Sequence, residues 1–98
     1  MHALSFLKKA RDELLKIEPI WQKRIKAKLE ILAKNPAALM NSIKALKGNK
    51  YKGLARLRVG NYRIIFQKKE KDLIILIVRI AHRGDVYRKI VLIPKPYS

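Results

Sequence analysis

Residues 54–67 read LARLRVGNYRIIFQ, and this stretch decides the fold because it encodes a β-hairpin. Apolar and polar side chains alternate with a period of two on both sides of Gly60-Asn61, a dipeptide suited to a two-residue hairpin turn. Successive side chains of a strand point to opposite faces of a sheet, so the hairpin is expected to have one apolar face and one basic face. The basic face is expected to carry Arg56, Arg58 and Arg63, with Leu54 and Ile65 among them.

The residues before the hairpin predict a short strand and a pair of helices. Residues 2–6 alternate weakly, as a short strand does. Apolar residues at helical spacing predict helices over residues 7–17 and 19–34, and Trp21 falls in the apolar stripe of the second, which predicts a core role for it. Residues 37–50 are expected to form a connector that opens with a turn of helix.

The residues after the hairpin predict a central strand and a short final element. Residues 68–72 form a charged turn, and the continuous apolar run of residues 73–80 is typical of a strand buried on both faces. A helical turn is expected over residues 84–87, and residues 91–93 are expected to pair at a sheet edge. The chain, residues 1–98, is thus predicted to be one α+β domain in which an N-terminal strand and a helical hairpin pack on a small, mostly antiparallel β-sheet.

The charge of the chain indicates a polyanionic partner. Its 98 residues include 24 Lys and Arg but only 7 Asp and Glu, which gives a formal net charge of +17. No acidic residue lies between Glu30 and Glu70. A nucleic acid is favoured over an anionic membrane, because the basic residues are densest on predicted strands rather than on an amphipathic helix.

Other protein classes are excluded by what the chain lacks. It has no cysteine, which excludes disulfides and cysteine-based zinc sites. The longest apolar run, residues 73–78, is too short to span a bilayer, and Lys8-Lys9 interrupts the apolar stretch at the N-terminus. A soluble, cytoplasmic protein without a membrane partner is therefore expected.

The stretch that follows the central strand collects groups that can do chemistry. Residues 79–88 read RIAHRGDVYR and include imidazole, guanidinium and phenol side chains. A strand end is where a rigid scaffold can aim such groups at a substrate. Counted along the strand, Arg79 falls on the face of Ile75 and Ile77, where it either joins the arginines of the hairpin or is held by an acidic partner.

Three segments, in this order and spacing, resemble the RelE branch of the RelE/ParE toxin superfamily: residues 46–48, 57–66 and 82–87, which read LKG, LRVGNYRIIF and HRGDVY. The resemblance implies an α+β fold with helices packed on a small antiparallel sheet. It also implies the toxin of a type II toxin–antitoxin system, which enters the ribosomal A site and cuts the messenger RNA there. The implied partners are a cognate antitoxin that blocks the toxin, the ribosome and the message.

The resemblance also implies site residues. Four residues match functional positions of the family: Arg56, Arg63, Arg83 and Tyr87. The chain departs from the family at Leu54, where the best-known members carry a lysine that is a candidate general base. Lys52 or His82 is then expected to compensate for that lysine.

The expected reaction is attack of an RNA 2′-hydroxyl on the adjacent phosphate. It needs a base, positive charge around the phosphorane and an acid for the departing 5′-oxygen. Arg56 and Arg63 suit the second task because a guanidinium stays charged and can bind two phosphate oxygens. Arg83 either stabilises the same charge or acts near the leaving oxygen. His82 can act as a base in its neutral form, which a cationic setting favours, and Tyr87 either acts as a base or stacks on an unpaired RNA base.

No metal and no other cofactor is expected, because the acidic residues are too few and too scattered for a divalent site. A second set of basic residues is expected to contact phosphates of ribosomal RNA: Lys44, Lys47, Lys50, Lys52, Arg58 and Lys69. Such contacts add salt-dependent affinity without sequence information. For any single one of them, a solvated surface side chain is an equally good interpretation.

Three alternatives to the nuclease stay open. The ParE branch shares the fold but inhibits DNA gyrase without cutting RNA; Arg63, Arg83 and Tyr87 favour RelE, whereas Leu54 argues against it. A second alternative is a non-catalytic module that binds RNA or the ribosome. A third is a degenerate toxin whose remaining partner is its antitoxin.

Overall fold

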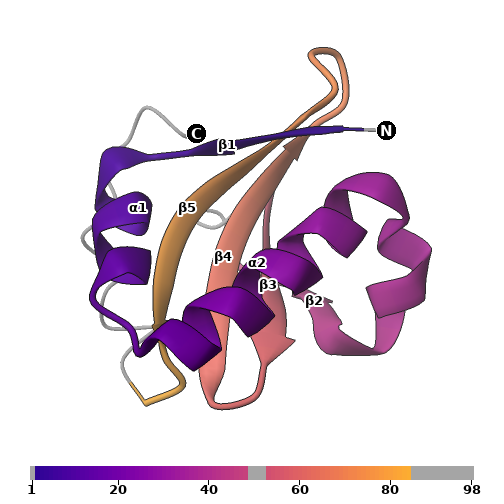
Figure 1. Cartoon of the computed structure of the whole chain (residues 1–98). Helices are drawn as coiled ribbons and strands as arrows, with labels where there is room; N and C mark the ends of the chain where they lie inside the picture. Colours follow the sequence, from indigo (N-terminus) through magenta and orange to yellow (C-terminus); the bar gives the residue numbers. More distant parts are fainter. Residues whose placement is uncertain (1, 49–52, 85–98) are drawn as a thin grey trace.

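A computed structural model describes residues 2–48 and 53–84 of the chain (Figure 1). The elements, in chain order, are β1 (Ala3–Phe6), α1 (Lys8–Leu15), α2 (Pro19–Lys34), the 3₁₀ helix η1 (Pro36–Ser42), β2 (Ile43–Ala45), β3 (Leu54–Val59), β4 (Tyr62–Lys69) and β5 (Ile74–His82). None of the helices in these two ranges is long and apolar enough to cross a membrane.

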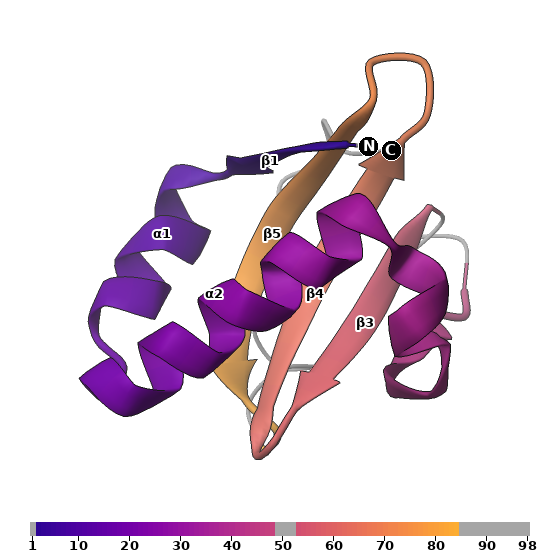
Figure 2. The ribbon, with the colours of Figure 1, turned by 45° about the vertical axis from the view of Figure 1, so that its right-hand side comes forward.

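The strands form one five-stranded sheet in the order β1-β5-β4-β3-β2. β1 runs parallel to β5, and the other neighbours are antiparallel. The helices α1 and α2 lie on one side of this sheet, and α2 crosses in front of β5, β4 and β3 (Figure 2). The predicted α+β fold, a strand and a helical hairpin on a mostly antiparallel sheet, is confirmed.

The core lies between the helices and the sheet, as the helical spacing of residues 7–34 and the alternation in the hairpin predict. Leu14, Ile25 and Leu29 from the helices meet Leu57 and Ile64 from the hairpin strands, and all five are buried. Fully burying one such side chain contributes about 1.5–3 kcal/mol to stability. The apolar residues of the helices and those on one face of the hairpin therefore pack together in one core.

β5 is buried on both faces, as its unbroken apolar run predicts. Ile75, Ile77 and Ile80 contribute to the core under the helices. Val78 and Ala81 belong to a second, smaller cluster on the other face of the sheet. A register shift lies between Ile77 and Arg79, because their partners Phe66 and Ile65 are consecutive in β4, so Val78 is the extra residue of a β-bulge in β5.

Two predicted boundaries in the strand region were wrong. The charged turn was placed at residues 68–72, but β4 continues through Lys69, which pairs with Ile74. β5 begins at Ile74 rather than Leu73, because Leu73 has a φ of 53° and closes the turn by donating its N–H to the Glu70 carbonyl. A left-handed residue cannot continue a strand, so the turn is shifted towards β5.

The connector holds more structure than a turn of helix. η1 and then β2 occupy it, and β2 pairs with β3 so that Ile43 stands opposite Leu57. A strand of three residues has too little alternation to be recognised in a sequence. The helical turn expected over residues 84–87 lies, apart from Gly84, outside the described residues, and so does the strand expected at residues 91–93.

Gly60 in the β3–β4 turn provides a test of the packing between α2 and the hairpin. Its φ is +58°, and a Cβ built there would overlap ring carbons of Trp21. We expect Gly60→Ala to lower the free energy of unfolding by more than about 1 kcal/mol, because a side chain at positive φ costs about that much before Trp21 is displaced. Gly84→Ala is the matched control, since a Cβ there meets nothing within 4 Å.

Urea unfolding followed by the fluorescence of Trp21, the single tryptophan of the chain, measures both variants. Equal midpoints and slopes for Gly60→Ala and Gly84→Ala would contradict this packing.

Candidate nucleic-acid interface

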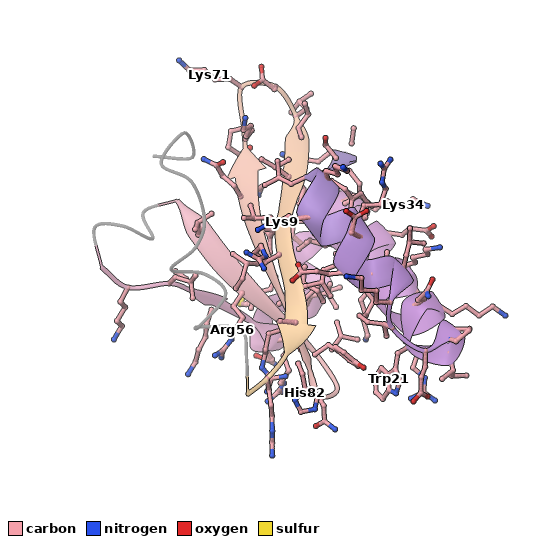
Figure 3. The ribbon with its side chains drawn as sticks, turned by 90° about the vertical axis from the view of Figure 1, so that its left-hand side faces the viewer. Lys9, Trp21, Lys34, Arg56, Lys71 and His82 are labelled. Carbon is pink, nitrogen blue, oxygen red and sulfur yellow. The ribbon has the colours of Figure 1, made fainter. Side chains whose placement is uncertain are left out.

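The strand register collects basic side chains on the face of the sheet that points away from the helices. Lys44 of β2 stands opposite Arg56 of β3, and Arg58 of β3 stands opposite Arg63 of β4. Figure 3 shows Arg56 on the side of the sheet away from the helices, whereas Trp21 lies on the helix side. The alternation predicted for the hairpin is therefore confirmed. Lys44, Arg56, Arg58 and Arg63 are called the arginine face below.

An apolar cluster lies beside these charges on the same face. Leu54, Ile65, Val78 and Ala81 are buried there, and Ile65 stands directly opposite Arg56. Charges next to an apolar, water-poor surface interact more strongly with a partner than charges in bulk water do. The face thus combines buried apolar side chains with cations, as an RNA-binding surface does.

The pairing of Arg58 with Arg63 is electrostatically unfavourable in the free protein. Like charges directly opposite each other destabilise a pair of strands. Arg63 is half-buried, and its Nη1 donates to the carbonyl of Gly60 at 2.9 Å and to that of Tyr62 at 3.0 Å, whereas Arg58 is exposed. These bonds hold one guanidinium against the turn. A phosphate bound between the two arginines would attract both guanidinium groups and so offset their mutual repulsion.

Arg83 reaches the same turn from β5. Its backbone N–H donates to the carbonyl of Asn61 at 2.7 Å, directly after the last residue of the strand, and its side chain is exposed. Arg63 contacts the carbonyl of the preceding residue, Gly60. Two arginines that lie 20 positions apart in the sequence are therefore anchored to neighbouring carbonyls of one turn.

His82 lies on the other face. It pairs with Tyr62 across β4 and β5, and the two rings meet edge to face with centroids 5.9 Å apart. The Tyr62 ring in turn lies 5.6 Å from that of Trp21. His82 is exposed and, together with Tyr62, borders a cavity of about 470 Å³ whose wall includes Lys9 and Lys16. The expected grouping of His82 with Arg56 and Arg63 is thus not what the structure has.

The β-bulge at Val78 is the physical reason. Without it, strict alternation from Ile77 would bring Arg79 to the helix side and His82 to the arginine face. The extra residue reverses both positions, so that Arg79 stands opposite Ile65 and His82 stands opposite Tyr62. The prediction that Arg79 shares the face of Ile75 and Ile77 was wrong for the same reason.

Arg79 is held by an acidic partner, the second of its two predicted roles. Its Nε and Nη2 donate to the two carboxylate oxygens of Glu13 in α1 at 3.2 and 3.1 Å. The same carboxylate accepts the backbone N–H of Ile80 at 3.0 Å. Nothing in the spacing of the sequence links Glu13 to Arg79, so this network was missed.

The remaining basic candidates are scattered. Lys47 is exposed just after β2, whereas Lys69 is exposed at the far end of β4. A strand rises about 3.3 Å per residue, which puts Lys69 roughly 23 Å from the Tyr62 end of its strand. Lys50, Lys52 and Tyr87 lie outside the described residues.

The end of the sheet near Lys69 is not purely cationic. Glu70 is 3.1 Å from the Lys68 ammonium and 3.4 Å from the imidazole of His2. The hydrogen bond from Lys68 is the main cause that lowers the pKa of Glu70. Lys69 therefore has a carboxylate, that of Glu70, directly after it in the chain. In residues 2–48 and 53–84, no three metal-ligating side chains gather at one place.

Comparisons with known proteins agree with this geometry. Residues 3–87 match the family described as ParE toxin of type II toxin–antitoxin system, parDE. A chain of the RelB–RelE antitoxin–toxin complex from Methanococcus jannaschii is 31% identical, with a TM-score of 0.66, over 85% of this chain and 94% of that one. No curated protein sequence matches.

Two further structures share the fold. A chain of the RelE–RelB complex from Pyrococcus horikoshii has a TM-score of 0.70 and 24% identity, covering 85% of this chain and 96% of that one. The isolated RelE toxin of E. coli has a TM-score of 0.67 and 20% identity, covering 94% of this chain and 97% of that one.

The opposed pair of arginines predicts a conflict between stability and binding. Arg58→Gln should raise the free energy of unfolding by about 0.2–1 kcal/mol, because it removes a like-charge cross-strand pair. It should also weaken binding of single-stranded RNA and reduce the slope of log affinity against log salt by about 0.7, the value for one lost phosphate contact. Lys71→Gln, at an exposed position in the β4–β5 turn, is the control and should change neither quantity.

Urea unfolding and RNA binding at several salt concentrations measure the two effects. An unchanged salt slope for Arg58→Gln would show that Arg58 makes no phosphate contact, and a lower stability would show that the Arg58–Arg63 pair is not repulsive.

Proposed function

The chain belongs to the RelE/ParE family of type II toxin–antitoxin toxins, and we propose that it is a metal-independent endoribonuclease that cuts messenger RNA in the ribosomal A site. The observation that carries the proposal is that the Arg63 guanidinium and the backbone N–H of Arg83 bind neighbouring carbonyls of the Gly60-Asn61 turn, with Arg58 opposite Arg63. This arrangement supports a site that stabilises negative charge on a phosphate.

The proposed reaction needs only the RNA and protein side chains. The 2′-oxygen attacks the adjacent phosphorus, the bond from phosphorus to the 5′-oxygen breaks, and the products are a 2′,3′-cyclic phosphate and a 5′-hydroxyl. A base takes the 2′-proton, and an acid gives a proton to the 5′-oxygen. Arg56 and Arg63 stabilise the phosphorane between these events, and Arg83 stabilises it from the β5 side, close to the leaving oxygen.

We assign the base to Lys52 or Tyr87 rather than to His82. Leu54 cannot act as a base, and His82 is paired with Tyr62 on the helix side of the sheet. Lys52 lies two positions before Leu54 in the chain, and Tyr87 matches a functional position of the family. In this assignment His82 supports the packing of the strand end and does not touch the RNA.

The partners follow from the family and from the charge. The neighbours in Methanococcus jannaschii and Pyrococcus horikoshii are complexes of RelE with RelB, and we infer a cognate antitoxin for this chain. We further propose that residues 1–98 act as one toxin domain in the cytoplasm, where the ribosome is. Phosphates of ribosomal RNA would be contacted by Lys44, Lys47, Lys50, Lys52, Arg58 and Lys69.

A gyrase inhibitor is the second candidate, because the matching family is described as the ParE toxin. Leu54, in place of a lysine, also fits a toxin without nuclease chemistry. Under this alternative the arginine face would bind an acidic surface of protein or DNA and no RNA bond would break.

The nuclease is tested by in vitro translation with the purified protein, followed by primer extension on the message. We expect a cut inside the A-site codon. Arg63→Ala and Arg83→Ala should each lower the cleavage rate about 100-fold or more, the usual cost of removing a donor that stabilises transition-state charge. Lys71→Ala, at the far end of the sheet from His82 (Figure 3), should cut at the wild-type rate.

A gyrase supercoiling assay on the same preparation separates the two candidates. Intact message at saturating toxin together with blocked supercoiling would overturn the nuclease in favour of the gyrase inhibitor. Cleavage with normal supercoiling is the result that the nuclease proposal requires.

A further inference from the structure

In the part of the chain that the structure describes, a strand partner accompanies β5 along only half of one edge. β1 pairs with it only from Ile74 to Ile77, and the last backbone bond of this edge runs from the N–H of Leu7 to the carbonyl of Ile77. The chain then turns into α1, which descends beside β5 (Figures 1 and 2). Within residues 2–48 and 53–84, β5 therefore has α1 rather than a strand along this edge from Val78 to His82. A buried backbone N–H on such an edge needs an acceptor from somewhere else.

The Glu13 carboxylate supplies that acceptor. It accepts the Ile80 N–H at 3.0 Å while both of its oxygens bind the Arg79 guanidinium. The side chains of Arg79 and Glu13 are only 8% and 14% exposed. One carboxylate thus replaces a strand carbonyl at Ile80 and neutralises the buried cation next to it.

Stability alone is a weak explanation for this network. A buried ion pair can often be replaced by apolar residues of similar volume with no loss of stability. The network, however, binds β5 two residues after the bulge at Val78, where the register of the strand has just been shifted. A slip of one residue at that point would turn every later side chain of β5 to the opposite face.

The register after the bulge decides where Arg83 lies. Ile80 pairs with Ile64, His82 pairs with Tyr62, and the N–H of Arg83 then meets the carbonyl of Asn61. Ile80 is thus three residues from Arg83, on a stretch of β5 whose opposite edge is paired with β4 from Arg79 to His82. A bond that fixes Ile80 also fixes Arg83 at the hairpin turn beside Arg63.

We propose that Glu13 is a positioning residue for this site: its carboxylate, by accepting the Ile80 N–H, holds the register of β5 so that Arg83 stays at the Gly60-Asn61 turn. The proposal rests on the proposed nuclease function for its effect on cleavage. The dependence of the position of Arg83 on Glu13 does not rest on that function. Glu13 itself touches no RNA.

Two double variants isolate the hydrogen bond from the charge. Glu13→Gln/Arg79→Met removes both buried charges and keeps an amide oxygen that can accept the Ile80 N–H. Glu13→Leu/Arg79→Met removes both charges and this acceptor as well. The pair avoids the single variants, in which an uncompensated buried charge would itself threaten folding.

The readouts are the kinetics of message cleavage on ribosomes and the hydrogen exchange of the Arg83 amide by NMR. We expect Glu13→Leu/Arg79→Met to lower kcat at least about tenfold relative to Glu13→Gln/Arg79→Met, because small displacements of catalytic groups cost that much or more. KM for the ribosome should agree within about threefold, since the binding lysines are untouched. The Arg83 amide should exchange faster in the Leu variant only.

Equal kcat and equal Arg83 exchange in the two variants, whatever their stability, would overturn the proposal. If the wild-type protein cuts no message, the nuclease function fails and Arg83 exchange alone decides. Faster exchange in Glu13→Leu/Arg79→Met than in its Gln counterpart then supports the positioning role, and equal exchange removes it. Should the Leu variant fail to fold while the Gln variant folds, Glu13 holds the fold rather than the site, which also overturns the proposal.

Discussion

The rest of the structure depends on the burial of β5 with both of its edges satisfied. Its side chains form the floor of the helix-covered core on one face and of a smaller apolar cluster on the other. Its backbone is paired with β4 along one edge, and with β1 and then the Glu13 carboxylate along the other. Each buried backbone N–H of β5 needs a hydrogen-bond acceptor. This need explains why β1 and α1 lie along the free edge of β5. The helices then cover one face of the sheet and leave the other to the arginines.

That constraint also explains why the charges can be so unbalanced. A domain with a net charge of +17 repels itself, and two of its arginines stand directly opposite each other on β3 and β4. The apolar layer on both faces of β5 and the helix stripes supply the stability that this arrangement removes. Carboxylates are used sparingly, and Glu13 lies in the interior against Arg79 rather than on the arginine face. The strand register therefore gathers Lys44, Arg56, Arg58 and Arg63 on the face that the helices leave uncovered.

Sequence reasoning recovers what local periodicity determines. The hairpin around Gly60-Asn61, the two helical stripes and the buried strand follow from spacings of two and of three to four residues. It could not recover β2, which is too short to show a period, or the left-handed Leu73. The bulge at Val78 could not be predicted either, because an extra apolar residue within a continuous apolar run does not change the pattern. That single residue moves His82 away from the arginine face and brings Arg79 opposite Ile65. The bond between Glu13 and Ile80 joins residues 67 positions apart and depends on tertiary structure alone.

We propose that this face breaks an RNA bond by attack of the neighbouring 2′-oxygen, and the chemistry of the cut end is the decisive measurement. A message that carries one 2′-deoxynucleotide at the scissile position of the A-site codon is translated beside the all-ribose message, with the purified toxin present. We expect the cut all-ribose message to end in a 2′,3′-cyclic phosphate and the deoxy message to stay intact at that bond. Cleavage of the deoxy message at the same bond would contradict it.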